Sequence, residues 1–166
     1  AEAAVAGLEP VTLLALLKHP LLRLGSGHHR HAIDILERAV LRGPRPSRGT
    51  AGLARALRTL RAVRDSLHPS DPRKNLSDGQ IGEAESLVAK LAAALEPLEG
   101  SGAASLSLSD LAERHRKVLA ALSEHNGEQV ALIGSDGTKL ADVLDELAAI
   151  PSAAGLAVAS SDYVEL

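Results

Sequence analysis

Leucine and alanine recur at helical spacing along almost the whole chain, and this pattern restricts the fold more than any other feature. Apolar residues three and four positions apart share one face of a helix, whereas a strand requires alternation. Hardly any segment is rich enough in β-branched residues to form a strand. The sequence therefore predicts an all-α protein, an irregular bundle of about six helices, with at most one short extended segment at residues 129–133.

The core of such a bundle has to be aliphatic, because the 166 residues include no Phe, no Trp and only one Tyr, Tyr163. A chain of this length buries roughly two-thirds of the surface that its unfolded form exposes, which is enough for one domain without cross-links. The absence of cysteine excludes disulfides, thiolate metal sites and cysteine nucleophiles. The longest apolar stretch is interrupted at Lys18, His19 and Pro20 and is too short to cross a bilayer. We expect one helical domain over residues 1–166, cut from a larger chain, with no membrane partner.

Capping residues and stop signals divide the chain into six predicted helices. The predicted helices cover residues 10–18, 30–41, 50–67, 77 to beyond 95, 108–125 and 138–150. Thr50 is a plausible N-cap of the third helix, and Ser77 with Gln80 fits a capping box for the fourth. Asn126-Gly127 is expected to close the fifth helix.

Two of these helices are predicted to bury wide apolar faces. The leucines of the first helix surround its axis, so we expect it to be buried on most sides. In the sixth helix we expect the apolar face to point inward. That face consists of Leu140, Val143, Leu144, Leu147 and Ile150.

Charge is distributed very unevenly along the chain. Residues 18–74 hold thirteen Lys or Arg against four Asp or Glu, a net charge of +9. Residues 75–166 hold five against fifteen, a net charge of −10. The overall charge of −3 therefore hides a basic half and an acidic half.

The basic half supplies the candidate binding residues, which are arginines around a proline-rich turn and on the helix after it. They are Arg42, Arg45, Arg48, Arg55 and Arg58. Such a patch can bind DNA phosphates with little base specificity and with a strong dependence on salt. It can equally pair with the acidic half of the chain or with a partner, or it can be a solvated face. The sequence leaves these three alternatives open.

Other conspicuous residues have ordinary structural explanations. His28 with His31, or His31 with Asp34, has one-turn spacing that a metal could use, but a polar helix start is the commoner meaning of such a cluster. We expect His115 to be a core histidine with a hydrogen-bond partner. The segment 134–139 lacks the order of a phosphate-binding loop and is expected to be a turn that caps the sixth helix. We predict no catalytic residues, no metal and no cofactor.

Three segments, in order, resemble a known family. They are PVTLLALLKHPLLRLG at residues 10–25, LERAVLRGPRP at 36–46 and LHPSDPRKNLSD at 67–78. These runs are similar to segments of alphaproteobacterial AddB-type double-strand-break repair proteins, and the similarity extends in the same order over nearly the whole chain.

The resemblance implies a cytoplasmic helicase-nuclease subunit that works with an AddA-like partner in recombination. This stretch is similar in position to the helical accessory insert, the 2B-like domain, of such helicases. No residue here matches the family's Walker lysine, nuclease set or cluster cysteines, so no catalytic role follows from it. The implied function is that of a non-catalytic domain that packs against the rest of its parent chain and contacts the DNA backbone, without a small-molecule substrate. The alternative is an α-helical module for protein interaction or self-association.

Overall fold

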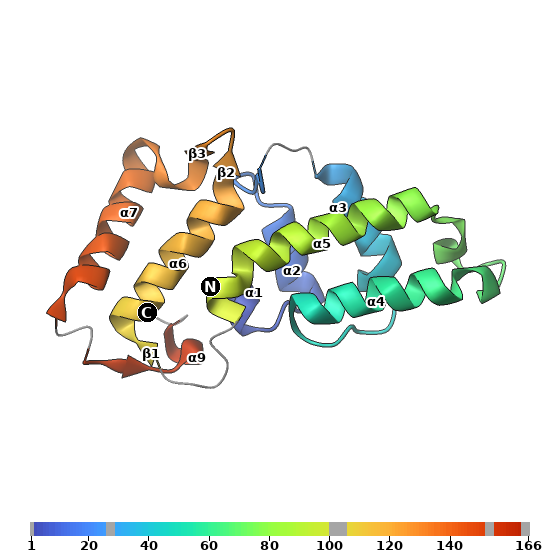
Figure 1. Cartoon of the computed structure of the whole chain (residues 1–166), viewed down its shortest axis with the longest axis horizontal. Coiled ribbons are helices and arrows are strands. Elements are labelled where there is room, and N and C mark those ends of the chain that lie inside the picture. The colour runs from blue at the N-terminus through green and yellow to red at the C-terminus, as the bar shows by residue number, and fades with distance from the viewer. Residues whose placement is uncertain (1, 26–28, 100–105, 152–154, 164–166) are drawn as a thin grey trace.

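The computed structural model describes residues 2–25, 29–99, 106–151 and 155–163, and in these residues the chain forms an irregular all-α bundle (Figure 1). Within them, six helices have seven or more residues. They are α2 (Pro10–Leu17), α3 (Arg30–Leu36), α4 (Gly49–Val63), α5 (Asp78–Glu99), α6 (Leu108–Ser123) and α7 (Gly134–Ala149). The predicted fold class is confirmed.

Shorter elements connect these helices. They are α1 (Glu2–Val5), the π-helical turn η1 (Glu37–Leu41), the 3-10 turns η2 (Arg64–Ser66), η3 (Pro72–Asn75) and η4 (Val130–Leu132), and α9 (Ser160–Tyr163). Two antiparallel pairs of two-residue strands complete the described part. β1 (Leu106–Ser107) pairs with β4 (Ala157–Val158), and β2 (Glu124–His125) pairs with β3 (Glu128–Gln129).

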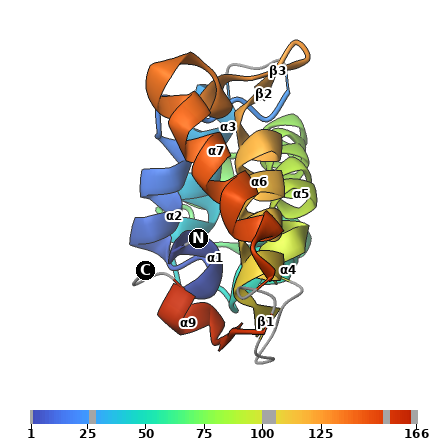
Figure 2. The same ribbon diagram turned by 90° about the vertical axis from the view of Figure 1, so that its left-hand side faces the viewer.

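Helix α5 is the centre of the bundle. Helices α3, α4 and α6 pack against it, and α7 packs on the far side of α6 (Figures 1 and 2). The aliphatic core runs between these helices, and its fully buried members come from four of them and from α2. Side chains with no exposed surface include Leu13, Ile35, Leu57, Ile81 and Leu91. In the described residues, no helix combines the length and the apolar character needed to cross a bilayer.

The start of α5 follows the prediction closely. The Ser77 N–H donates to Gln80 Oε1 at 2.9 Å, and the Gln80 N–H donates to Ser77 Oγ at 3.2 Å. This is the reciprocal arrangement of a capping box, which satisfies two backbone donors at the helix start. The predicted inner face is also confirmed, because Ile81, Ala84, Val88, Leu91 and Leu95 are all buried.

The second predicted helix is confirmed as α3 followed by η1. Ile33, Leu36 and Val40 are buried on one side of it, as expected. Its last five residues widen into a π-helical turn, in which the Arg42 N–H donates to the Glu37 carbonyl at 3.0 Å.

The predicted N-cap of α4 was wrong, because Thr50 lies inside the first turn and Arg48 precedes the helix. The Thr50 N–H donates to Glu99 Oε1 at 2.9 Å, and the Thr50 hydroxyl donates to Glu99 Oε2. The Glu99 carboxylate at the end of α5 therefore accepts hydrogen bonds from a backbone N–H and a hydroxyl in the first turn of α4. A cap acceptor 49 residues away leaves no local signal in the sequence.

The predicted closure of the fifth helix was also wrong. Helix α6 ends at Ser123, and Asn126 and Gly127 have φ values of 51° and 87°. Two successive positive φ angles make a tight hairpin turn, whereas a helix C-cap needs only one such residue. The turn joins β2 to β3, so only Gln129 of the expected extended segment 129–133 lies in a strand, and η4 follows it.

Burial was overestimated in the first and sixth helices. In α2, Leu13 and Leu17 are buried but Val11 is 81 % exposed, because this helix lies at the edge of the molecule (Figure 2). In α7, only Leu144 of the five predicted inward residues is buried, while Val143 is 53 % exposed and Leu140 is 40 % exposed. Helix α7 packs against α6 and η4, and in the described residues no further layer covers its opposite side.

Helix α7 begins at Gly134, four residues before the predicted start. The segment 134–139 is therefore the first part of the helix and not a preceding turn. Gly134 has a φ of 76°, which redirects the chain after Ile133, and Asp136 lies in the first turn, where a negative charge favours the helix.

Candidate functional site

Two of the five candidate arginines are held by carboxylates of the same chain. Arg42 Nη2 lies 2.8 Å from Glu37 Oε1, and Arg42 Nε donates to the same oxygen at 3.1 Å. Arg45 pairs with Glu9, which precedes α2. Both arginines remain exposed, but much of their charge is compensated locally.

The other three candidates, Arg48, Arg55 and Arg58, are exposed and form no ion pair within the described residues. Arg55 and Arg58 are three positions apart on the outer side of α4, so they are neighbours on the helix surface. Arg48 immediately precedes this helix, and its side chain lies against the backbone of Gly7. These three guanidiniums are the free cations of the predicted set, and we call them the α4 arginines.

A groove beside α4 brings two of the candidate arginines together with Arg73, which was not among the predicted residues. Arg55 lines it from the helix, Arg45 from the proline-rich segment, and Arg73 from η3. Arg73 is held by Asp71 through bonds from Nε and Nη2, the latter at 2.6 Å. The guanidinium lowers the pKa of the Asp71 carboxyl to about 2. Arg38 and Arg42 line an adjoining hollow on the other side of Arg73.

Pairing between the basic and acidic halves occurs, but it involves different arginines. Arg61 lies 2.7 Å from Glu85, and Arg64 lies 2.9 Å from Asp78. Both acids are on α5, so these contacts join α4 and η2 to the central helix. The acidic half therefore pairs with Arg61 and Arg64 and not with the three α4 arginines before them.

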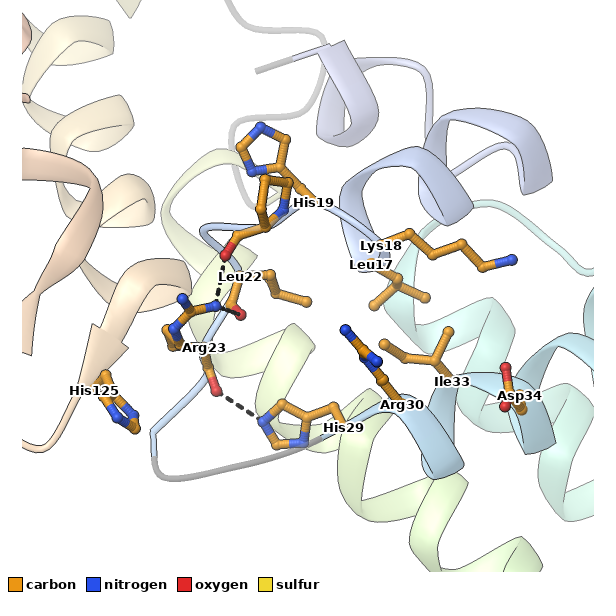
Figure 3. A pocket seen from close by; sticks show the side chains of 11 residues that line it. Leu17, Lys18, His19, Leu22, Arg23, His29, Arg30, Ile33, Asp34 and His125 are labelled. Carbon is orange, nitrogen blue, oxygen red and sulfur yellow. Dashed lines mark hydrogen bonds between the residues drawn. The ribbon is translucent and has the colours of Figure 1, made fainter. Parts of the chain in front are cut away.

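The histidine cluster is not brought together as a metal site. His28 lies outside the described residues. His31 Nε2 faces Glu83 on α5 at 3.8 Å, whereas Asp34 lines a cavity beside α2 (Figure 3). Across the residues that the structure describes, no group of three potential ligands has the geometry to hold a metal ion.

His115 has the predicted hydrogen-bond partner, but it is half-buried and not a core residue. Its Nδ1 lies 3.1 Å from the Tyr163 hydroxyl, and the two rings meet edge to face with centroids 5.7 Å apart. Burial lowers the pKa of His115 to about 4 and raises the pKa of Tyr163. The pair fixes α9 on α6.

Comparison with known proteins does not assign this chain to a family. No family model, no curated protein and no solved structure matches the chain. Any functional assignment therefore depends on the residues themselves and on the resemblance of the three ordered segments.

Proposed function

We propose that this chain is a non-catalytic helical domain of an AddB-type helicase-nuclease subunit, and that it contacts DNA phosphates through the α4 arginines. The parent would act in double-strand-break repair in the cytoplasm, with an AddA-like subunit as partner. The observation that carries the DNA contact is that, in the described residues, no carboxylate pairs with Arg48, Arg55 or Arg58, whereas Arg61 and Arg64, farther along the same segment, each pair with one. The ordered resemblance of residues 10–25, 36–46 and 67–78 supports the parentage.

The contact would position DNA and would not read its sequence. Guanidiniums bind phosphate oxygens through paired N–H groups, and such contacts carry no base information. The chain also has no Phe or Trp on which bases could stack, and its one Tyr, Tyr163, is half-buried against His115. We expect similar affinity for unrelated duplexes of equal length.

Fluorescence anisotropy with a labelled duplex at low ionic strength tests this function. Replacing Arg48, Arg55 and Arg58 together by Gln should abolish most of the binding, because three phosphate contacts are lost. A matched control replaces Lys90, Lys117 and Lys139 by Gln, which changes the net charge equally but in the acidic half. Equal losses in both variants, or no binding by the wild type, would show that the α4 arginines are not a DNA contact.

The exposed face of α7 favours a second candidate function, a protein-interaction or self-association module. Leu140 and Val143 are each at least 40 % exposed and lie on one side of this helix, and Ile133, which is 53 % exposed, immediately precedes it. Contiguous exposed apolar residues mark interaction surfaces. Light scattering distinguishes the two: a dimer that persists in high salt and dissociates on Val143→Asp favours self-association, whereas a monomer favours a domain that packs inside a larger chain.

A further inference from the structure

A groove of about 430 Å³ lies between helices α4 and α5, and we call it the α4–α5 groove. Small aliphatic side chains line it, with Ala51 and Ala54 on α4 and Ala89 and Ala92 on α5. Val88 also lines it, and its side chain is buried. Grooves with alanine walls let a further helix approach closely and receive its apolar face. The α4–α5 groove therefore suits a helix that carries a narrow row of larger aliphatic side chains.

Helix α7 of the same chain carries such a row. Leu140, Val143 and Leu147 follow one another at helical spacing, so they lie on one side of the helix. Leu140 is 40 % exposed, Val143 is 53 % exposed and Leu147 is half-buried. We call these three side chains the α7 row. Their exposure leaves aliphatic surface that a partner can cover.

The α7 row and the α4–α5 groove match in length. At a rise of about 1.5 Å per residue, Leu140 to Leu147 spans about 10 Å along α7. Ala51 to Arg58, which line the groove from α4, span the same distance of about 10 Å. A helix that lies along the groove can therefore place all three side chains of the row in it.

Charges beside the two surfaces are opposite in sign. Arg58 lines the groove and has no ion pair within the described residues, whereas Glu85, which also lines it, is held by Arg61 at 2.7 Å. On α7, four acidic residues stand against one lysine. Among these acids, exposed Glu146 is three positions from Val143 and has no ion pair in the part of the chain that the structure describes. The groove thus presents a positive edge and the row a negative one.

Within one molecule the two surfaces lie apart. Figure 1 shows α7 at one end of the long axis and α4 in the opposite half of the molecule. The row of one molecule can therefore meet only the groove of another. Such a contact is head-to-tail, and because each copy keeps one free row and one free groove, it can repeat.

We propose that this chain self-associates head to tail, with Leu140, Val143 and Leu147 of one copy in the α4–α5 groove of a second copy. The apolar contact provides the affinity, and Arg58 opposite Glu146 fixes the direction of the contact. The proposal rests on the second candidate function, self-association, and adds the surface that α7 meets. Arg58 is also one of the α4 arginines, so the association is measured without DNA.

Sedimentation velocity of the chain over a range of concentrations tests the association. We expect the weight-average sedimentation coefficient to rise with concentration beyond the value of a dimer, because a head-to-tail contact leaves a free surface at each end. A rise that stops at a dimer would overturn the head-to-tail arrangement. A monomer at every concentration would overturn both this proposal and the second candidate function.

Substitutions in the groove and in the row test the two surfaces separately. Ala89→Leu fills the groove and Val143→Ser removes part of the row, and each should weaken association about tenfold. The matched control is Val11→Ser, which changes a still more exposed valine on α2 and should leave association unchanged. A loss on Val143→Ser with no effect of Ala89→Leu would overturn the groove as the partner surface, while self-association through α7 would stand.

Exchanging the charges at Arg58 and Glu146 tests the direction of the contact. Arg58→Glu and Glu146→Lys should each weaken association about fivefold, because like charges then face each other. An equimolar mixture of the two variants should recover wild-type association, since each copy then meets the opposite charge on the other. Recovery also shows that both variants fold. A mixture that associates as weakly as its components would overturn the pairing of Arg58 with Glu146.

Discussion

At the scale of single residues, the half-buried His115 couples the stability of this fold to pH. It lies on α6, and its Nδ1 is 3.1 Å from the Tyr163 hydroxyl. Burial disfavours the charged imidazolium and lowers the pKa of His115 from 6.5 to about 4. The folded state therefore keeps this ring neutral at pH values where the unfolded chain would protonate it.

We predict a loss of stability on mild acidification that originates at His115. The depressed pKa means that the unfolded chain binds more protons between about pH 6.5 and pH 4, so stability falls as the pH falls through this window. After allowance for partial exposure, the loss should be about 1–2 kcal/mol. Urea unfolding of the wild type and of His115→Gln at pH 7 and pH 4.5 measures it, because the variant lacks this contribution.

Exposed His68 provides the matched control for removing an imidazole. The His115→Gln variant should show a smaller difference in unfolding free energy between the two pH values than His68→Gln does. The same pH dependence in both variants would contradict the assigned role of His115.

At the scale of elements, α4 is fixed by close contacts with the segment before it. An alanine methyl at Gly52 would lie 1.8 Å from the Ser47 carbonyl oxygen, so only glycine lets the proline-rich segment pack on this helix. Gly82 also lies inside a helix, α5, but a methyl there would meet nothing closer than the end of Arg61 at 3.8 Å. There is therefore no room for a side chain at Gly52, whereas Gly82 has room for a methyl group.

We predict that Gly52→Ala and Gly82→Ala change stability in opposite directions. Gly52→Ala should destabilise by about 1–3 kcal/mol, because backbone atoms must move to admit the methyl group. Gly82→Ala should stabilise by about 0.5–1 kcal/mol, since alanine loses less backbone entropy in a helix. Thermal melts of both variants measure this; two shifts of the same sign would mean that the packing at Gly52 is not as described.

Elements whose ends depend on neighbouring residues could be predicted from the sequence, and elements whose ends depend on distant residues could not. The capping box of Ser77 and Gln80 is local, so residue types and spacing were sufficient to predict it. The start of α4 depends on Glu99 and the end of α6 on a hairpin partner, and neither appears in a window of helical periodicity. The exposed face of α7 has the apolar pattern of a buried one, because periodicity indicates a face but not what covers it.

At the scale of the whole molecule, folding sorts the basic half into paired and free arginines. Charge counts predicted the basic half, but three-dimensional proximity alone could show that Glu37, Glu9, Asp78 and Glu85 each hold an arginine. The α4 arginines were among the predicted candidates. The α4–α5 groove was not predicted, because its walls come from two helices that are far apart in the chain.

The central claim is that the α4 arginines contact DNA phosphates, and the salt dependence of duplex binding tests it most directly. Each neutralised phosphate contributes about −0.9 to the slope of the logarithm of the binding constant against the logarithm of salt concentration. We predict a slope of about −3 for the wild type and a slope near zero for the variant in which Arg48, Arg55 and Arg58 are all Gln. A slope that is unchanged in this variant would contradict the claim.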